Sequence, residues 1–291
     1  MTDETRPLGE GWDLHAHEWI AWSRTGLDSY EEFHRDAFLP LVPRAGQLTV
    51  DVGCGEGRVS RDLQALGHRV LAIDLSLVMS RAAATHPAAP VPAVVADAAR
   101  LPLATGTADC AVAFMSLHDT DHMPAAVREI ARILSVGGRL VLAIVHPINS
   151  AGEFTGDRTD IDRPFVIDGS YLQPARYVDT FTRDSMTVTF HGEHRPLQAY
   201  TEALADAGFV IERLREPTNV DPAKPWRRIP LFLNILAALE RRAALRVRES
   251  RHSGTGEAGP VSRAYSAARR GRGRAAGRLV RDHRVPTQSS G

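Results

Sequence analysis

The sequence predicts an α/β protein built on a doubly wound, mainly parallel sheet with helices on both faces. Three observations predict it. Short apolar runs alternate with amphipathic helical patterns between about residues 48 and 145, a glycine-rich turn follows the first run, and acidic residues close the next two. Strands this continuously apolar are typical of parallel sheets covered on both faces.

The elements of this region follow from their local patterns. Strands are expected at 48–52, 68–74, 91–97, 108–116 and 139–145. Helices are expected at 58–66 and 77–85, because apolar residues recur there at steps of three and four. A further helix should begin at Asp121, a capping residue, and end at the glycine pair 137–138.

The remaining segments are expected to complete the sheet and to flank it. Residues 146–195 are irregular and are interpreted as an insertion that covers the substrate, with His191 and His194 shaping the loop before the next helix. A helix should start near Leu197 and stop at Gly208, followed by a strand at 209–214. Residues 229–237 are expected to form a final strand, with a terminal helix as the alternative. A helix over 12–24 should lie against the body.

Composition limits the class of protein. The chain has 291 residues, 43% of them hydrophobic, enough for one sizeable core. No signal peptide or membrane span is expected, and two cysteines without metal-ligand spacing suit a reducing cytoplasm. Residues 241–291 hold 13 Arg and three acidic residues, so this tail carries +10 and residues 1–240 carry −10. The tail is expected to be disordered, with a nucleic-acid arm as the alternative.

The glycine-rich turn is the first candidate site. The stretch VDVGCGEGRVS, residues 50–60, places Gly53, Gly55 and Gly57 where the first strand turns into its helix. Ligands of doubly wound sheets bind at this edge, and missing side chains would let backbone N–H groups approach them. The alternative is a tight turn with no ligand. The spacing departs from the dinucleotide pattern G-x-G-x-x-G because Arg58 stands at the third glycine position.

Two acidic residues strengthen the case for a nucleoside. Asp74 ends the second strand, where a carboxylate can accept from both ribose hydroxyls. Asp97 ends the third strand; its carboxylate could accept from an exocyclic amine while the Ala98 N–H donates to a ring nitrogen. Each acid alone is more often a cap or turn residue, but three strand ends in register favour a binding site.

These motifs together resemble class I S-adenosylmethionine-dependent methyltransferases of the small-molecule, type 11-like subgroup. The resemblance covers about residues 12–237 and rests on VDVGCGEG, AIDLS, ADAARLP and the stretch SLHDTDHMPAAVREIARILSVGGRLVLAIVHP. It implies a Rossmann-like sheet of seven strands in the order 3-2-1-4-5-7-6, with the last strand antiparallel. Residues 1–240 would form the methyltransferase domain, with the insertion at 146–195 and the tail at 241–291.

The resemblance also implies a cofactor site for S-adenosylmethionine. Asp51 and the backbone of Gly53 and Gly55 would hold the methionine end, Asp74 the ribose, and Asp97 with Ala98 the adenine, while Met115 and Ser116 would flank the methyl-transfer site. Trp19 falls where the family has Tyr and cannot copy every hydrogen bond of a hydroxyl. The full set of implied cofactor residues is Trp19, Asp51, Gly53, Cys54, Gly55, Asp74, Leu75, Asp97, Ala98 and Met115.

The acceptor is expected to be a small molecule, methylated by in-line displacement at the sulfonium carbon. His118 and His146 follow the fourth and fifth strands and are candidate general bases, with packing as the alternative for each. Aromatic residues of the insertion could stack on a flat acceptor or form a satellite core; these are Phe154, Phe165, Tyr171, Tyr177 and Phe181. No metal is expected, because Asp119 and Asp121 lack a third oxygen ligand.

Three rival functions remain open. Methylation of RNA or another nucleic acid could use the basic tail, although MSLHD stands where base amino-methyltransferases have an Asn/Asp-Pro-Pro-aromatic motif, and Cys110 lies within a strand. A protein that binds S-adenosylmethionine without transferring its methyl would show affinity and no turnover. A nicotinamide oxidoreductase would respond to NAD in thermal-shift assays. The sequence does not indicate the oligomeric state.

Overall fold

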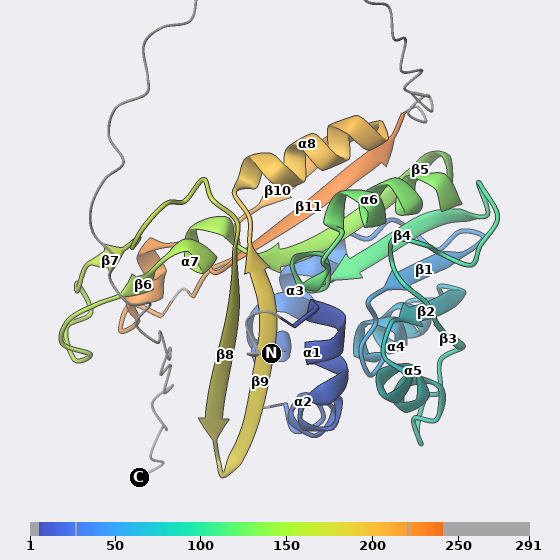
Figure 1. The fold of residues 1–291 in the computed structure, drawn as a ribbon. Helices are drawn as coiled ribbons and strands as arrows, with labels where there is room; N and C mark the ends of the chain where they lie inside the picture. The colour runs from blue at the N-terminus through green and yellow to red at the C-terminus, as the bar shows by residue number, and fades with distance from the viewer. Residues whose placement is uncertain (1–5, 27, 220, 241–291) are drawn as a thin grey trace, which may run out of the picture.

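A seven-stranded sheet forms the centre of the molecule in this computed structural model, which describes residues 6–26, 28–219 and 221–240 (Figure 1). Its strands lie in the order β3-β2-β1-β4-β5-β11-β10, and β11 alone runs antiparallel to its neighbours. The predicted α/β fold and strand order are therefore confirmed. The strands are β1 (Thr49–Val52), β2 (Val70–Asp74), β3 (Ala93–Val95), β4 (Ala108–Phe114), β5 (Leu134–Val145), β10 (Phe209–Arg215) and β11 (Phe232–Leu239).

Helices cover both faces of this sheet (Figure 1). One apolar cluster packs Ile130 and Leu204 against one face, and a second packs Phe38 and Leu63 against the other. The two clusters account for the alternation of apolar strands and amphipathic helices in the sequence. The covering helices are α3 (Arg35–Phe38), α4 (Arg58–Ala65), α5 (Leu77–Ala84), α6 (Met123–Ile133) and α8 (Leu197–Ala207).

Some helices begin or end at the residues that the sequence predicts, and others do not. The Ser76 hydroxyl accepts from the Met79 N–H at 3.3 Å to cap α5, and Gly208, with φ 92°, ends α8. The expectation that Asp121 caps α6 is wrong: its carboxylate accepts from the Leu8 N–H at 3.0 Å and pairs with a distant arginine. Helix α6 also ends earlier than expected, at Ile133, and the glycine pair 137–138 lies inside β5.

The segment 146–195 forms several small elements beside the sheet. Helix α7 (Pro147–Ala151) precedes the paired strands β6 (Glu153–Phe154) and β7 (Phe165–Val166), and a hairpin joins β8 (Ala175–Arg183) to β9 (Met186–His194). His191 and His194 therefore lie in a strand, not in the expected loop, because the alternating run that starts at Met186 extends to the end of β9.

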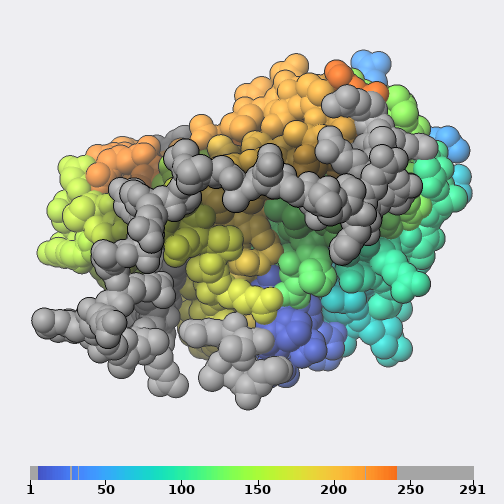
Figure 2. Space-filling model, turned by 45° about the horizontal axis from the view of Figure 1, so that its top comes forward, coloured from blue at the N-terminus to red at the C-terminus, as the bar shows by residue number. Residues whose placement is uncertain are grey.

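The N-terminal helices lie against this hairpin, as the dark-blue and yellow surfaces of Figure 2 show. The helix expected over 12–24 is divided at His15 into α1 (Leu8–Leu14) and α2 (Ala16–Ser23). Short helical turns follow at Tyr30–His34, Leu39–Leu41, Leu117–Asp119 and Pro225–Arg228. Among the described residues, no helix is long and apolar enough to cross a membrane. The expected disordered tail, 241–291, lies outside the described residues.

Candidate active site

A cavity of about 1260 Å³ opens at the carboxyl ends of the central strands, between the N-terminal helices and the hairpin. Pockets for single small ligands are commonly about 300–1,000 Å³, so this cavity can hold a cofactor and a second molecule. One histidine predicted from the sequence, His118, lines it, and the other, His146, does not. All ten expected cofactor residues line it: Trp19, Asp51, Gly53, Cys54, Gly55, Asp74, Leu75, Asp97, Ala98 and Met115.

Asp51 lies at the floor of this cavity with one carboxylate oxygen unused. Its Oδ2 accepts from the Ser60 hydroxyl at 2.5 Å, whereas Oδ1 is buried and has no hydrogen-bond partner. Burial raises the pKa of Asp51 to about 7. A buried carboxylate oxygen without a partner is unfavourable unless a ligand donates to it. Asp51 therefore fits the ammonium group of a methionine moiety.

The backbone N–H groups of the glycine turn are directed at the protein itself. Gly53 and Cys54 both donate to the Ile73 carbonyl, at 2.7 and 3.0 Å, and Gly55 donates to the Asp74 carboxylate at 2.8 Å. This differs from the expectation that these N–H groups face a ligand. Strand β2 lies beside β1, so its carboxyl end supplies the acceptors that the turn needs.

The glycines are explained by backbone conformation and by close neighbours. Gly53, Gly55 and Gly57 have φ values of 72°, 56° and 87°, which side chains disfavour. A Cβ at Gly53 would lie 2.3 Å from the Ser116 Cβ, and one at Gly57 would lie 2.8 Å from the Ala83 Cβ. The absence of side chains thus lets two other segments pack closely against the turn.

Two further acids surround the turn as the sequence predicts. Asp74 accepts from the Gly55 and Ser76 N–H groups at 2.8 and 2.9 Å, and burial raises its pKa. A carboxylate offers about four lone-pair positions, so both oxygens can still accept from ribose hydroxyls. Asp97 is exposed at the cavity edge, and its side chain accepts from the Ala99 N–H at 2.8 Å.

Trp19 closes the cavity over the glycine turn. Its Nε1 lies 3.3 Å from the position of a Cβ built on Gly55, and the Arg58 guanidinium lies 5.2 Å from its ring centroid. Arg58 also lies 4.4 Å from the ring centroid of Tyr30 and pairs with Asp28. Sequence reasoning noted Arg58 only as a departure from the dinucleotide pattern. Its position between two aromatic rings links helix α4 to the N-terminal segment.

Met115 and Ser116 follow β4 in an unusual backbone conformation. Met115 has φ 51°, one of few non-glycine residues described in the left-handed region. Its N–H donates to the Ala143 carbonyl at 2.8 Å, and the Ser116 hydroxyl donates to the Val52 carbonyl at 2.7 Å. Backbone of this kind persists where surrounding contacts fix it, commonly at functional sites.

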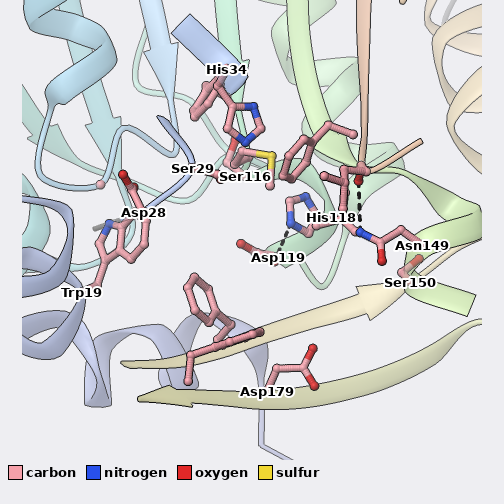
Figure 3. A pocket seen from close by; sticks show the side chains of 18 of the residues that line it. Trp19, Asp28, Ser29, His34, Ser116, His118, Asp119, Asn149, Ser150 and Asp179 are labelled. Atoms are coloured by element: carbon pink, nitrogen blue, oxygen red, sulfur yellow. Dashed lines mark hydrogen bonds and ion pairs between the residues drawn. The ribbon is translucent and has the colours of Figure 1, made fainter. Parts of the chain in front are cut away.

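His118 is buried on the cavity wall, and one of its ring nitrogens has no hydrogen-bond partner. Its Nε2 lies 3.3 Å from the Asp119 carboxylate, as the dashed line in Figure 3 marks, and its Nδ1 has no hydrogen-bond partner. Burial, with a smaller contribution from Arg195, lowers the pKa of His118 to about 3, and burial raises the pKa of Asp119. The imidazole is therefore neutral near pH 7 and can accept a hydrogen bond from a ligand.

His146 has a different role. Its Nδ1 accepts from the Ile148 N–H at 3.1 Å to cap α7, and its Nε2 contacts Glu216 at 3.0 Å. Both ring nitrogens are engaged, and the residue does not line the cavity. These contacts favour the packing alternative over the expected catalytic role. No sequence pattern indicates this cap, because histidine is not a common N-cap residue.

Aromatic residues of the insertion divide between the two expected roles. Tyr177 and Phe181 line the cavity, whereas the Tyr171 hydroxyl accepts from the Leu197 N–H at 3.0 Å. Phe154 lines the cavity and also packs edge-to-face with Phe165 and Trp226, with ring centroids 5.1 and 4.8 Å away. The insertion therefore contributes both a satellite core and part of the cavity wall.

Several residues that line the cavity have no counterpart in the sequence predictions. His34, from the turn Tyr30–His34, and Phe232, from β11, pack against each other in the cavity wall, with ring centroids 3.9 Å apart. Their positions depend on packing between segments about 200 residues apart, and no local pattern signals that. In the described part of the chain, no three His, Cys, Asp or Glu side chains cluster as metal ligands would.

The chain is similar to S-adenosylmethionine-dependent methyltransferases in sequence and in fold. Residues 50–142 match the family model described as "Methyltransferase domain". A crystal structure of an S-adenosylmethionine-dependent methyltransferase from Mesorhizobium loti aligns with a TM-score of 0.56 and 27% identity, over 70% of this chain and 96% of that one. The family model covers about a third of the chain, and over that part the chain is similar to this family.

Curated relatives match over the cofactor-binding part. A demethylmenaquinone methyltransferase of Corynebacterium kroppenstedtii is 35% identical over 102 residues, 35% of this chain and 43% of the relative. A malonyl-[acyl-carrier protein] O-methyltransferase of Legionella pneumophila is 30% identical over 119 residues, 40% of this chain and 41% of the relative. The matched region spans less than half the length of either relative.

Proposed function

We propose that the protein transfers the methyl group of S-adenosylmethionine to a small-molecule acceptor. The observation that carries this proposal is the convergence of the expected cofactor residues and His118 on one cavity large enough for two molecules. The names of the matched relatives, which include demethylmenaquinone and malonyl-[acyl-carrier protein] methyltransferases, support small-molecule or carrier-bound acceptors.

The residues present fit the cofactor at both ends. The free Oδ1 of Asp51 would accept from the cofactor ammonium, and Asp74 would accept from the ribose hydroxyls. Asp97 and the Ala98 N–H would meet the adenine at the cavity edge, while Trp19 and Leu75 would cover the ligand. When bound, S-adenosylmethionine supplies a methyl group activated by the adjacent sulfonium.

The remaining task of the protein is to align an acceptor and exclude water. Orientation of two reactants can supply about 7–11 kcal/mol of the barrier reduction. His118 would orient the acceptor through its free Nδ1. Because burial lowers the pKa of His118 to about 3, the ring is a weak proton acceptor, and a general base works best with a pKa near the working pH. We therefore propose orientation as its main contribution and retain proton abstraction as the alternative.

The rival functions have weaker support. A basic arm for nucleic acid falls in 241–291, outside the described residues. The cavity walls, which include Phe181 and Phe190, suit a flat organic molecule better than a polynucleotide backbone.

The two cysteines bear on the expected location of the protein. Cys54 and Cys110 are both buried free thiols, which is compatible with the expected reducing cytoplasm.

A two-part experiment tests the proposed function. Calorimetry with S-adenosylhomocysteine measures cofactor binding, and a metabolite library with labelled S-adenosylmethionine measures methyl transfer. We expect binding, and transfer to at least one small molecule. His118→Ala should lower turnover at least tenfold with unchanged affinity for S-adenosylhomocysteine. Binding without transfer to any compound would favour a non-catalytic binding protein, and a larger thermal shift with NAD would favour an oxidoreductase.

A further inference from the structure

A second buried histidine faces the cavity and is not used by the function proposed above. His34 is 3% exposed and lines the cavity, and its Nδ1 atom is buried without a hydrogen-bond partner. A buried polar atom without a hydrogen-bond partner destabilises the protein. At a cavity wall, a polar atom of a bound molecule can remove that cost.

Aromatic contacts fix the His34 ring in place. Its centroid lies 5.0 Å from that of Phe114, in edge-to-face geometry, and 3.9 Å from that of Phe232. Phe114 ends β4 and Phe232 begins β11, so two strands of the central sheet hold the ring. A polar group held by rigid elements suits recognition better than one on a mobile loop.

His34 and His118 share the same burial, the same unpaired ring nitrogen and the same protonation state. Each is buried, lines the cavity and has an Nδ1 without a partner, and Figure 3 shows both rings at the cavity. Burial lowers the pKa of His34 to about 3, as it does for His118, so neither ring is charged near pH 7. Neutral imidazoles offer hydrogen bonds to uncharged polar groups and give no ion pair to a carboxylate.

The walls around these rings include flat, apolar side chains. Phe33, Phe114 and Phe232 line the cavity with the two histidines. Aromatic rings favour stacked or edge-to-face contacts with another ring. Among charged side chains, Arg58 acts on His34, and Asp119 and Arg195 act on His118.

We propose that His34 and His118 together bind one flat, uncharged acceptor through two of its polar atoms. His118 holds the polar group nearer the methyl donor, and His34 holds the second, while the phenylalanine rings contact the acceptor's faces. The inference rests on the proposed function, since it names the acceptor class of the same cavity.

Calorimetry on the protein saturated with S-adenosylhomocysteine tests this without requiring turnover. Three probes are compared: methyl 3,4-dihydroxybenzoate, methyl 4-hydroxybenzoate, and the anion 3,4-dihydroxybenzoate. We expect the uncharged dihydroxy ester to bind at least tenfold more tightly than the other two. Equal or tighter binding of the anion, or no measurable binding of the dihydroxy ester, would overturn the proposal.

Variants at His34 test whether this residue binds the second polar group of the acceptor. His34→Phe keeps the aromatic packing, and it should lower affinity for the dihydroxy ester about tenfold while leaving the monohydroxy ester unchanged. His34→Asn places an amide near the Nδ1 position and should recover part of the loss. His17→Phe, on the exposed face of α2, is the matched control and should bind as the wild type does.

The outcomes separate this inference from the proposed function. Affinity of each variant for S-adenosylhomocysteine should stay within twofold, which shows that the fold and the cofactor site are intact. Wild-type affinity of His34→Phe for the dihydroxy ester would refute the role of His34 and leave methyl transfer untouched. Absence of methyl transfer to any compound, with the expected probe binding, would refute the proposed function alone.

Discussion

The Asp74 carboxylate and the Gly55 amide are joined by a hydrogen bond of 2.8 Å, which ties the end of the second strand to the glycine turn after the first. The same carboxylate accepts from the Ser76 N–H at 2.9 Å. Asp74 thus holds the turn in shape and still presents lone pairs to the cavity. The residue expected to bind the ribose is also a structural support of the neighbouring turn.

Replacing Asp74 by Ala should therefore weaken cofactor binding for two reasons. The variant loses the proposed ribose acceptor, and the Gly55 N–H loses its partner. We expect the Kd for S-adenosylhomocysteine to rise at least thirtyfold, about 2 kcal/mol, by calorimetry. Asp36→Ala, an exposed acid on α3, is the control and should bind normally. An unchanged Kd for Asp74→Ala would remove Asp74 from the cofactor site.

Cofactor affinity should depend on pH through Asp51. Burial raises the pKa of this carboxyl to about 7, so in the free protein it takes up a proton as the pH falls below 7. The protonated form lacks the charge that would attract an ammonium group. We expect the Kd for S-adenosylhomocysteine to rise by up to tenfold per pH unit between pH 7 and 5. Asp51→Asn should bind weakly with a flat profile; an unchanged slope in that variant would assign the pH dependence elsewhere.

Two glycine substitutions separate backbone strain from steric overlap. Gly57 and Gly67 have φ values of 87° and 88°, but a Cβ would lie 2.8 Å from the Ala83 Cβ at Gly57 and meet nothing within 4 Å at Gly67. Gly67→Ala should cost about 1–2 kcal/mol of stability from the left-handed conformation. Gly57→Ala should cost about 1–3 kcal/mol more from overpacking.

Urea unfolding of both glycine variants measures this difference. Equal losses would show that helix α5, which carries Ala83, shifts without cost. A larger loss for Gly57→Ala together with reduced affinity for S-adenosylhomocysteine would show that the packing of α5 supports the cofactor site.

Asn234 lies away from the cavity, and its environment allows a prediction about stability. This residue of β11 is fully buried, and both polar atoms of its side chain lack a hydrogen-bond partner. Burying an unpaired amide costs about 1–3 kcal/mol. Asn234→Leu should therefore raise the free energy of unfolding by about that amount. Asn149→Leu, which removes the hydrogen bond of 3.1 Å from the Asn149 side chain to the Leu231 carbonyl, should lower it. Destabilisation by Asn234→Leu would indicate that Asn234 has a partner in solution.

Local patterns were sufficient to place the expected cofactor residues at one edge of the sheet. Asp51 lies in the first strand, and Asp74 and Asp97 fall at or after the ends of the next two. The carboxyl ends of parallel strands meet at one edge of a sheet, so residues placed by sequence position alone converge on one cavity. The strand order then followed from the resemblance, with the structure confirming it.

Sequence position does not distinguish the roles of His118 and His146. Both follow strands that end at this edge, and both are buried. The difference lies in what each ring contacts: His146 caps α7 and meets Glu216, whereas His118 lines the cavity and its Nδ1 has no hydrogen-bond partner. Glu216, which contacts the His146 ring, lies 70 positions away along the chain.

The sequence by itself determined the sheet, its covering helices and the cofactor edge, because these depend on periodicity, turn chemistry and strand ends, all of which are local. Only the tertiary structure decided how the glycine turn is satisfied, which histidine faces the cavity, and that His34 joins it. Each of these outcomes depends on burial and on partners far along the chain. Burial decides whether a histidine ring is charged, and the neighbouring groups decide whether its nitrogens have hydrogen-bond partners. No local sequence pattern predicts either property.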